Sequence, residues 1–249
     1  MKQQKLGSFG EFVKQYEKAR RPYPKEAFEF LKSKLINKNP KILDLGCGTG
    51  ISTRQLVKVG EVIGCDPDVR MLRAAKLNKW PGNIKYVVGR ADKLPFKDES
   101  FDIVSAFSSF HWFDNKKSIK EIKRVLKPDG FFIAVNNTGI KSFGQDYRSV
   151  IIKSIGQEVA QFKSAFYNPR RALQNSDFRN IKVKTWKNEE LYSLKNILEF
   201  IQSVSIWSTV PKHLRLKALE GLKEYFKEVL ASKGEIKRKM ILKVVLAKK

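Results

Sequence analysis

Asp44-Leu45-Gly46-Cys47-Gly48-Thr49-Gly50 is a glycine-rich loop that follows a short apolar run and precedes a helical pattern. Glycine lets a backbone approach a ligand without a Cβ clash. Ligands of open α/β sheets bind at the carboxyl ends of strands, near the point where the strand order reverses. The spacing is Gly46-x-Gly48-x-Gly50, and Ile51 stands where a dinucleotide fingerprint requires glycine. The loop therefore predicts a ligand site on an α/β sheet and disfavours a nicotinamide-dependent oxidoreductase.

Short apolar runs and helical patterns alternate around this loop. We expect strands at 41–45, 61–65, 84–88, 101–107 and 131–135, and helices at 9–19, 24–36, 51–59, 68–77 and 115–126. Pro24 can start one of these helices, and Asp68 is placed as the N-cap or in the first turn of another. Near-continuous apolar strands that alternate with helices indicate a parallel sheet covered on both faces.

The rhythm changes after about residue 140. Helices are expected near 144–163, 169–175, 194–206 and 211–231, and strands at 180–187 and 236–247. One apolar stripe on the helix at 211–231 predicts a core face, formed by Leu219, Leu222, Phe226, Val229 and Leu230. We expect the segments 140–175 and 190–232 to lie partly over the strand ends and to shape a substrate pocket. The last two strands should complete the sheet.

The net charge of +25 favours anionic partners. Residues 1–135 hold 27 basic and 15 acidic residues (+12), and residues 136–249 hold 23 and 10 (+13), so the excess is spread evenly. Lysine also predominates, whereas bidentate phosphate recognition tends to use arginine. A lysine-rich solvated surface is the favoured interpretation, and nucleic acid remains the alternative partner.

The remaining composition points to a cytoplasmic protein. Apolar residues make up 42% of the chain, and no uncharged run reaches the ~20 residues of a membrane-spanning helix. The N-terminal residues contain no apolar signal segment. Cys47 and Cys65 fit reduced thiols better than a disulfide. We expect no metal site, no membrane insertion, and a monomer or a homodimer.

Two aspartates follow the next two strands. Asp66 ends the strand in Val62-Ile63-Gly64-Cys65-Asp66-Pro67, where a carboxylate can accept from both hydroxyls of a ribose. Asp92, in Gly89-Arg90-Ala91-Asp92, is placed to accept from the exocyclic amine of an adenine. The alternative for Asp92 is a loop or cap residue.

An ordered set of motifs over about residues 9 to 135 makes the resemblance specific. These motifs are Ile42 to Gly50, Val62 to Pro67 with Met71-Leu72, Ala91 to Phe96, Ser100 to Val104, His111-Trp112-Phe113, and Glu121 to Gly130. The sequence resembles the class I S-adenosylmethionine-dependent methyltransferases, within the small-molecule group of ubiquinone/menaquinone-biosynthesis and trans-aconitate methyltransferases. Two residues depart from the family: Asp129 stands where glycine is common, and Asp68 where serine is common.

The resemblance implies a Rossmann-like fold, with a seven-stranded, mostly parallel sheet, helices on both faces and an antiparallel last strand. It implies one methyltransferase domain over 1–249: N-terminal helices at 1–36 over the cofactor site, a cofactor-binding core at 37–139, and helical insertions at 140–175 and 190–232. S-adenosylmethionine is the implied cofactor and S-adenosylhomocysteine the product.

The resemblance also assigns roles at the cofactor site. Gly46 and Gly48 should pass under the methionine and ribose, and Asp44 should orient the loop. Asp66 should bind the ribose and Pro67 flank the adenine. The remaining implied cofactor contacts are Cys47, Ala91, Asp92, Phe107, Tyr16 and Arg21.

His111 and Arg21 are the candidates nearest the chemistry. His111 follows the fourth strand. With the ordinary histidine pKa of ~6.5 it could take a proton from the methyl acceptor. The alternative is that its side chain only packs at the strand end. Arg21 could pair with the methionine carboxylate or with an acidic acceptor, or be a surface arginine. The predicted reaction is methyl transfer to a small molecule by in-line displacement, and the alternative is an RNA methyltransferase. A cofactor-binding fold without an acceptor site is a third interpretation.

Overall fold

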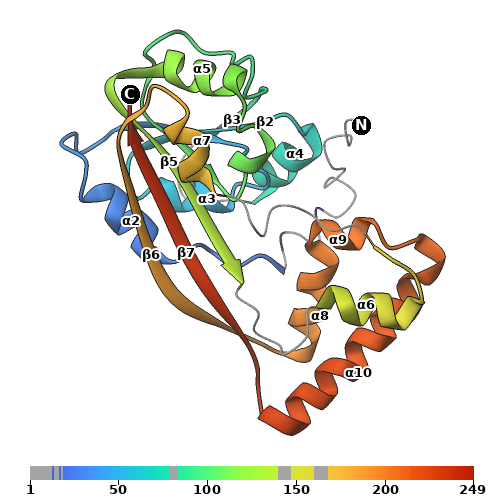
Figure 1. The fold of residues 1–249 in the computed structure, drawn as a ribbon. Helices are drawn as coiled ribbons and strands as arrows, with labels where there is room; N and C mark the ends of the chain where they lie inside the picture. The colour runs from blue at the N-terminus through green and yellow to red at the C-terminus, as the bar shows by residue number, and fades with distance from the viewer. Residues whose placement is uncertain (1–12, 14–16, 18, 79–83, 140–146, 160–167) are drawn as a thin grey trace. The chain divides into compact units, whose positions relative to one another are not determined.

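The computed structural model describes the chain except for residues 1–12, 14–16, 18, 79–83, 140–146 and 160–167 (Figure 1). The helix predicted at 9–19 therefore lies mostly outside the described residues. The first half of the chain forms α2 (Lys25–Lys32), β1 (Lys41–Leu45), α3 (Ile51–Leu56), β2 (Glu61–Asp66), α4 (Val69–Leu77), β3 (Lys85–Val88), β4 (Phe101–Phe107), the 3-10 helix η2 (Phe110–Trp112) and α5 (Lys116–Val125). The second half forms β5 (Leu126–Gly139), α6 (Tyr147–Ile155), α7 (Pro169–Gln174), β6 (Arg179–Tyr192), α8 (Leu194–Ser203), α9 (Ser205–Ser208), η4 (Lys212–Leu214), α10 (Arg215–Lys233) and β7 (Ile236–Lys248).

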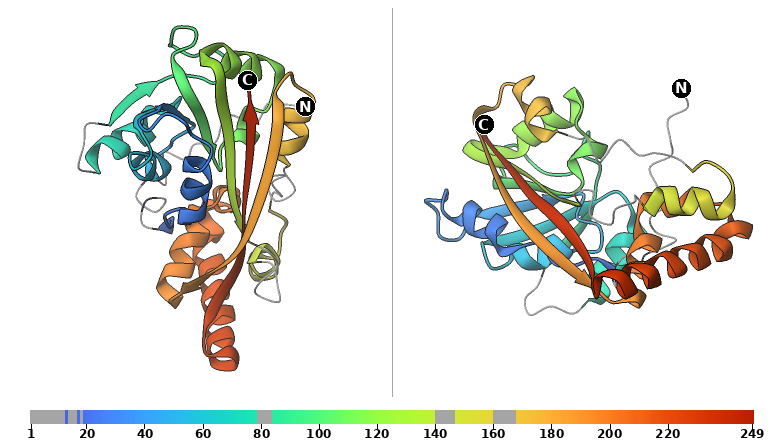
Figure 2. Two further views of the ribbon diagram at one scale, coloured as in Figure 1. Left: turned by 90° about the vertical axis from the view of Figure 1, so that its left-hand side faces the viewer. Right: turned by 60° about the horizontal axis from the view of Figure 1, so that its bottom comes forward.

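Seven strands form one sheet in the order β3-β2-β1-β4-β5-β7-β6. The pairs from β3 through β5 are all parallel. β7 lies between β5 and β6 and runs opposite to both (Figures 1 and 2). This architecture confirms the Rossmann-like fold predicted from the sequence. The strand order reverses between β1 and β4, so the carboxyl end of β1 is the switch point where such sheets bind ligands.

Adjacent residues of β1 hold helices on opposite faces of the sheet. Ile42 packs in one apolar cluster with Leu31 of α2. Leu43 packs in another with Ile122 of α5 and Leu173 of α7. All five of these side chains are fully buried. The continuous apolar strand is therefore explained by two layers of helices, since alternate side chains of a strand point to alternate faces.

Two helix starts match local signals in the sequence. Pro24 precedes α2 with φ −56°, the angle that its ring imposes. Asp68 is the N-cap of α4, and its carboxylate accepts a hydrogen bond from the backbone N–H of Arg70 at 2.9 Å. An N-cap carboxylate satisfies a helix donor that has no intrahelical partner. Both predictions of helix starts are confirmed, although α2 ends at Lys32 and not near residue 36.

The connection from α5 to β5 differs from the prediction. The helix ends at Val125, and Leu126 already pairs with Phe101 of β4, so β5 begins at residue 126 and not at 131. Within it Asp129 has φ +65°, in the left-handed region. Glycine enters that region at no steric cost, whereas aspartate is one of the few other residues that visit it. This backbone angle accounts for the glycine common at that position in the resembling family.

The chain divides into two compact units. One holds most of the sheet and consists of residues 22–137, 166–186 and 242–249; the other is mainly helical and consists of residues 1–21, 138–165 and 187–241. In the helical unit α6, α8, α9 and α10 share an apolar cluster. The stripe predicted on α10 belongs to this core: Leu222, Phe226 and Val229 are buried, and Leu219 and Leu230 pack against the cluster.

Helix α7 packs against the core of the sheet unit. The sequence suggested one helical insertion over 140–175, but α7 belongs to the sheet unit. Its Leu173 is fully buried in the cluster that contains Leu43. A six-residue helix with one strongly buried leucine gives too short a pattern to show which core it joins. A substrate pocket shaped by the insertions stays a prediction.

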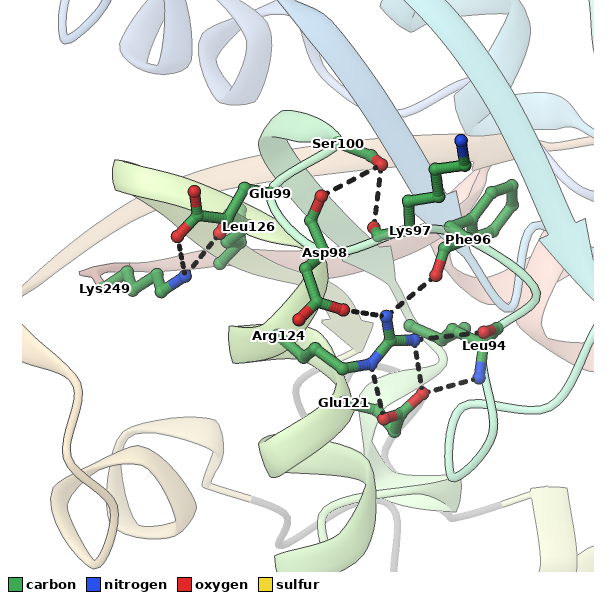
Figure 3. A network of polar contacts seen from close by, with 10 residues as sticks. All are labelled: Leu94, Phe96, Lys97, Asp98, Glu99, Ser100, Glu121, Arg124, Leu126 and Lys249. Atoms are coloured by element: carbon green, nitrogen blue, oxygen red, sulfur yellow. Dashed lines mark hydrogen bonds and ion pairs between the residues drawn. The ribbon is translucent and has the colours of Figure 1, made fainter.

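A polar network joins the loop at 94–98 to α5 (Figure 3). The carboxylate of Glu121 accepts a hydrogen bond from the backbone N–H of Leu94 at 2.8 Å. The guanidinium of Arg124 donates to the carbonyl oxygens of Phe96 at 2.8 Å and Leu94 at 3.1 Å. Arg124 also pairs with Glu121, and this pairing lowers the pKa of the Glu121 carboxyl. The loop after β3 is therefore held by two charged side chains of one helix.

The network predicts that Arg124→Ala lowers the free energy of unfolding by about 2 kcal/mol, since hydrogen bonds to charged groups contribute ~1.5–3 kcal/mol. Urea denaturation measures the change. Lys120→Ala, on the exposed face of the same helix, is the control and should change stability by less than ~0.5 kcal/mol. Equal effects of the two variants would show that the hydrogen bonds of Arg124 do not stabilise the fold.

Candidate functional site

The glycine loop leaves β1 through three residues with positive φ. Gly46, Gly48 and Gly50 have φ of +69°, +54° and +80°, which glycine adopts without strain. The backbone N–H groups of Gly46 and Cys47 donate to the carbonyl oxygen of Cys65 at 2.7 and 3.2 Å. The loop is thus tied to the end of β2.

Asp44 holds the loop from within the core. Its side chain is fully buried, and its carboxylate accepts hydrogen bonds from the hydroxyls of Ser52 at 2.7 Å, Thr53 at 2.7 Å and Ser105 at 2.8 Å. Burial raises the pKa of Asp44 to about 6, and the three hydroxyls act against that rise. Because Ser52 and Thr53 belong to α3, one carboxylate connects the two elements that the loop joins.

Asp66 lies at the end of β2, next to the loop. One carboxylate oxygen accepts from the backbone N–H of Gly48 at 2.9 Å, and the other from that of Asp68 at 2.8 Å. The side chain is nearly buried, and burial raises the pKa of Asp66 against the effect of both hydrogen bonds. The structure therefore brings together Asp66 and Gly48, which the sequence placed at one site.

Space and apolar surface lie beside this carboxylate. A Cβ built on Gly48 would meet no atom within 4 Å. Val88, which pairs in register with Asp66, is 53% exposed, and Val69 is 45% exposed. Pro67, directly after Asp66 in the chain, is exposed as well. Val69 and Val88 were not among the residues predicted for the site. Val88 is the last residue of β3 and Val69 directly follows the N-cap Asp68, and an apolar residue at either position was the available signal.

The segment after β3 presents Asp92 with a partner. The guanidinium of Arg90 donates to both carboxylate oxygens at 2.9 Å, and this pair lowers the pKa of Asp92. Both side chains are partly exposed, so a ligand can reach the pair. Ala91 is half-buried against the sheet core.

The remaining residues predicted to contact the cofactor do not border the open space above Gly48 in any contact that the structure describes. Cys47 is buried in the loop. The ring of Phe107 stacks on that of Phe28 with centroids 5.4 Å apart, so its side chain belongs to the core. Arg21 donates to the carbonyl oxygen of Leu191 and lies over the ring of Tyr192, both in the helical unit. Tyr16 lies outside the described residues.

His111 follows β4 in the short helix η2. Its ring is tilted against that of Trp112, with centroids 4.8 Å apart. Burial lowers the pKa of His111 to about 4, below the ~6.5 expected from the sequence. The imidazole is therefore neutral at physiological pH.

The sheet order, the glycine loop at the switch point and the acidic end of β2 define a fold of the methyltransferase type. A family model described as a methyltransferase domain matches residues 43–134. An uncharacterized methyltransferase of Schizosaccharomyces pombe is 30% identical over 222 residues, which cover 87% of this chain and 86% of the relative.

Two further comparisons agree with this family. The ubiquinone/menaquinone biosynthesis C-methyltransferase UbiE of Rickettsia typhi is 37% identical over 148 residues, 52% of this chain and 59% of that protein. The solved structure of a proposed type II methyltransferase of Anaeromyxobacter dehalogenans shares the fold, with a TM-score of 0.67 and 21% identity, over 92% of this chain and 97% of that one. The chain belongs to the class I S-adenosylmethionine-dependent methyltransferases.

Among the described residues, no helix has both the length and the apolar character that crossing a membrane requires.

The loop geometry predicts that Gly46→Ala and Gly48→Ala differ in their effect on folding. A Cβ on Gly46 would lie 2.7 Å from the Cβ of Ser109, whose hydroxyl is fixed by donation to the carbonyl oxygen of Leu45. Gly46→Ala should therefore lower the free energy of unfolding by about 3 kcal/mol, combining the left-handed strain with overpacking. Gly48→Ala adds only the strain, about 1 kcal/mol. Urea denaturation of both variants measures these changes. A larger loss of unfolding free energy in Gly48→Ala than in Gly46→Ala would contradict this geometry.

Proposed function

We propose that S-adenosylmethionine binds across the carboxyl ends of β1, β2 and β3, with its adenosine beside Asp66 and its methionine part over Gly46 and Gly48. When bound, this cofactor supplies a methyl group activated by a sulfonium sulfur. The observation that carries the proposal is the carboxylate of Asp66, held by Gly48 and Asp68 next to open space above the loop.

The residues around Asp66 fit an adenosine. A carboxylate has about four lone-pair sites, so two backbone donors leave room for the hydroxyls of a ribose. The exposed side chains of Val69 and Val88 can contact an adenine ring. Asp92 can accept from the exocyclic amine while it keeps Arg90 as a partner. Asp44, buried under the loop, binds no ligand in this account and fixes the conformation of the loop.

We infer a small molecule as the methyl acceptor. The basic excess is shared by both units: 29 basic and 14 acidic residues in the sheet unit, and 21 and 11 in the helical unit. A localised basic surface, the usual mark of a nucleic-acid site, is not indicated by this distribution. The name of the UbiE relative, which aligns with half of this chain, refers to small-molecule biosynthesis.

We also infer a cytoplasmic location, because two buried, unbridged cysteines fit the reducing cytoplasm.

RNA is the second candidate acceptor, because a net charge of +25 attracts phosphates. Release of S-adenosylhomocysteine, measured with panels of small acceptors and of RNA, separates the two candidates. The proposal predicts turnover with a small molecule. Turnover with RNA alone, together with RNA affinity that falls steeply with salt, would replace it by the second candidate.

His111 has a defined protonation state in this proposal. A neutral imidazole with a pKa of about 4 is a weak base. It suits an acceptor atom that already carries a free electron pair, because such an acceptor chiefly needs alignment with the methyl group. His111 would then orient the acceptor or accept a weakly held proton from it.

Asp66→Ala should weaken the binding of S-adenosylhomocysteine by about 1.5–3 kcal/mol, the range for hydrogen bonds to a charged group. Isothermal titration calorimetry measures this change. Asp177→Ala, whose side chain is 96% exposed, is the matched control and should bind with unchanged affinity. Unchanged affinity of a folded Asp66→Ala variant would remove Asp66 from the ribose site.

His111→Ala should lower kcat far more than it changes cofactor affinity. A general base contributes roughly 10²–10⁴-fold, and alignment contributes up to ~10²-fold, so rates alone do not separate the two roles. If His111 is a base, wild-type kcat/KM falls on the acid side with a midpoint near 4, and the variant loses this limb. If His111 aligns the acceptor, kcat falls and the pH profile keeps its shape. Wild-type turnover by the variant would contradict both roles.

A further inference from the structure

Asp92 lies in a short turn that closes on its own backbone. The backbone N–H of Lys93 donates to the carbonyl oxygen of Arg90 at 3.1 Å, and these two residues form an isolated antiparallel bridge. The guanidinium that holds the Asp92 carboxylate belongs to Arg90, whose side chain is 61% exposed. An ion pair this open to water is weak, because solvent and salt screen it. The pair alone therefore does not determine where Asp92 lies.

The end of the turn next to β3 is held by the sheet. The backbone N–H of Gly89 donates to the carbonyl oxygen of Asp66 at 3.3 Å. A Cβ on Gly89 would lie 2.8 Å from Cδ of Pro95, so the missing side chain lets Pro95 approach the base of the turn. The two ends of the turn are therefore close together, beside the residue proposed to bind the ribose.

The other end of the turn is held by α5 through Leu94, the residue after Lys93 (Figure 3). The N–H of Leu94 donates to the carboxylate of Glu121 at 2.8 Å, and its carbonyl oxygen accepts from the guanidinium of Arg124 at 3.1 Å. Glu121 and Arg124 pair with each other at 2.8 Å, and their side chains are only 21% and 28% exposed. Hydrogen bonds to charged groups are stronger than neutral ones. One helix thus binds both backbone polar groups of the residue that follows the turn.

We propose that Glu121 and Arg124 are positioning residues for recognition of the base: by binding both backbone groups of Leu94, they keep the turn at 90–93 where the Asp92 carboxylate accepts from the exocyclic amine of adenine. The proposal rests on the proposed function in one point, the adenine beside Asp92. It adds that the preference for adenine depends on α5, through two residues outside the set of cofactor contacts named above.

The competing explanation is that this network only stabilises the fold. Loss of Glu121 would then lower stability and leave the preference for adenine unchanged in the folded protein. Asp98 provides a matched control, because its carboxylate also pairs with Arg124, at 2.7 Å. Glu121→Ala and Asp98→Ala each remove a carboxylate from the same guanidinium, but only Glu121→Ala also removes the acceptor of the Leu94 N–H.

Hydrogen exchange of the full chain without ligand tests the hold on the turn. In Glu121→Ala the amide of Lys93 should exchange about tenfold faster, since the turn loses an anchor while the acceptor of this amide on Arg90 stays in place. The amide of Gly89, on the sheet side, should keep its wild-type rate. Asp98→Ala should leave both rates unchanged. An unchanged Lys93 rate in Glu121→Ala would overturn the proposal.

Calorimetry tests recognition of the base with two ligands, S-adenosylhomocysteine and its 6-deamino analogue, in which hydrogen replaces the exocyclic amine. The wild type should bind S-adenosylhomocysteine about tenfold more tightly than the analogue, as expected for a hydrogen bond to a charged group. In Glu121→Ala the two Kd values should differ by less than about twofold, because the turn no longer holds Asp92 at the amine. Asp98→Ala should keep the wild-type ratio. Glu121→Gln should keep it as well, since its amide oxygen can still accept from Leu94.

Arg124→Ala tests the same turn from the carbonyl side of Leu94 and serves if Glu121→Ala does not fold. It too should lose the preference for the amine. A wild-type ratio in the folded Glu121→Ala or Arg124→Ala variant would overturn the proposal, and so would equal binding of the two ligands by the wild type. Failure of the wild type to bind either ligand would contradict the proposed function, and the exchange of Lys93 would then decide whether α5 holds the turn.

Discussion

The buried carboxylate of Asp44 is the interaction on which the site depends. It accepts hydrogen bonds from hydroxyls on α3 and β4 while it belongs to β1 itself, so it fixes three elements around the switch point. Its folded pKa of about 6 lies above the ordinary 3.8. The stability linked to the protonated form is fully present below pH ~3.8 and is lost as the pH rises through 6. The protein therefore carries a buried charge at neutral pH in order to keep the loop in place.

The consequences of that fixed loop extend outward through backbone groups. With the loop held, the N–H of Gly48 points at Asp66, and the N–H of Asp68 satisfies the second oxygen while its own side chain caps α4. Hydrogen bonds thus connect the loop to the end of β2 and to the start of α4. The groups proposed to contact the cofactor are mostly backbone atoms of the loop, or a side chain that backbone N–H groups hold in place. Such fixed groups suit a reaction in which alignment is the main requirement.

Much of this was predictable, because it depends on local chemistry. The glycine spacing, the cap at Asp68 and the apolar strands each carry their own physical signal. Features set by neighbours distant in sequence were not predictable. The ring of Tyr86 beside Gly64, and Leu173 in the sheet core, depend on strand order and on which unit a short helix joins. The lowered pKa of His111 depends on burial that one sequence does not reveal.

Glu121 and Arg124 illustrate a third case. Glu121 and Arg124 belong to one motif of the resembling family, and Leu94 and Phe96 belong to another. The sequence offers no physical reason why the two motifs occur together. The structure joins the two motifs through hydrogen bonds, so their occurrence together reflects one contact (Figure 3). Such motif pairs are readable as contacts only once the topology brings α5 beside the loop after β3.

The central claim is that the loop and Asp66 form a site for S-adenosylmethionine. Calorimetric titration of the full chain with S-adenosylhomocysteine, beside a parallel titration with a nicotinamide dinucleotide, tests it most directly. The account predicts saturable one-to-one binding of S-adenosylhomocysteine and no binding of the dinucleotide. Binding of the dinucleotide without binding of S-adenosylhomocysteine would contradict it.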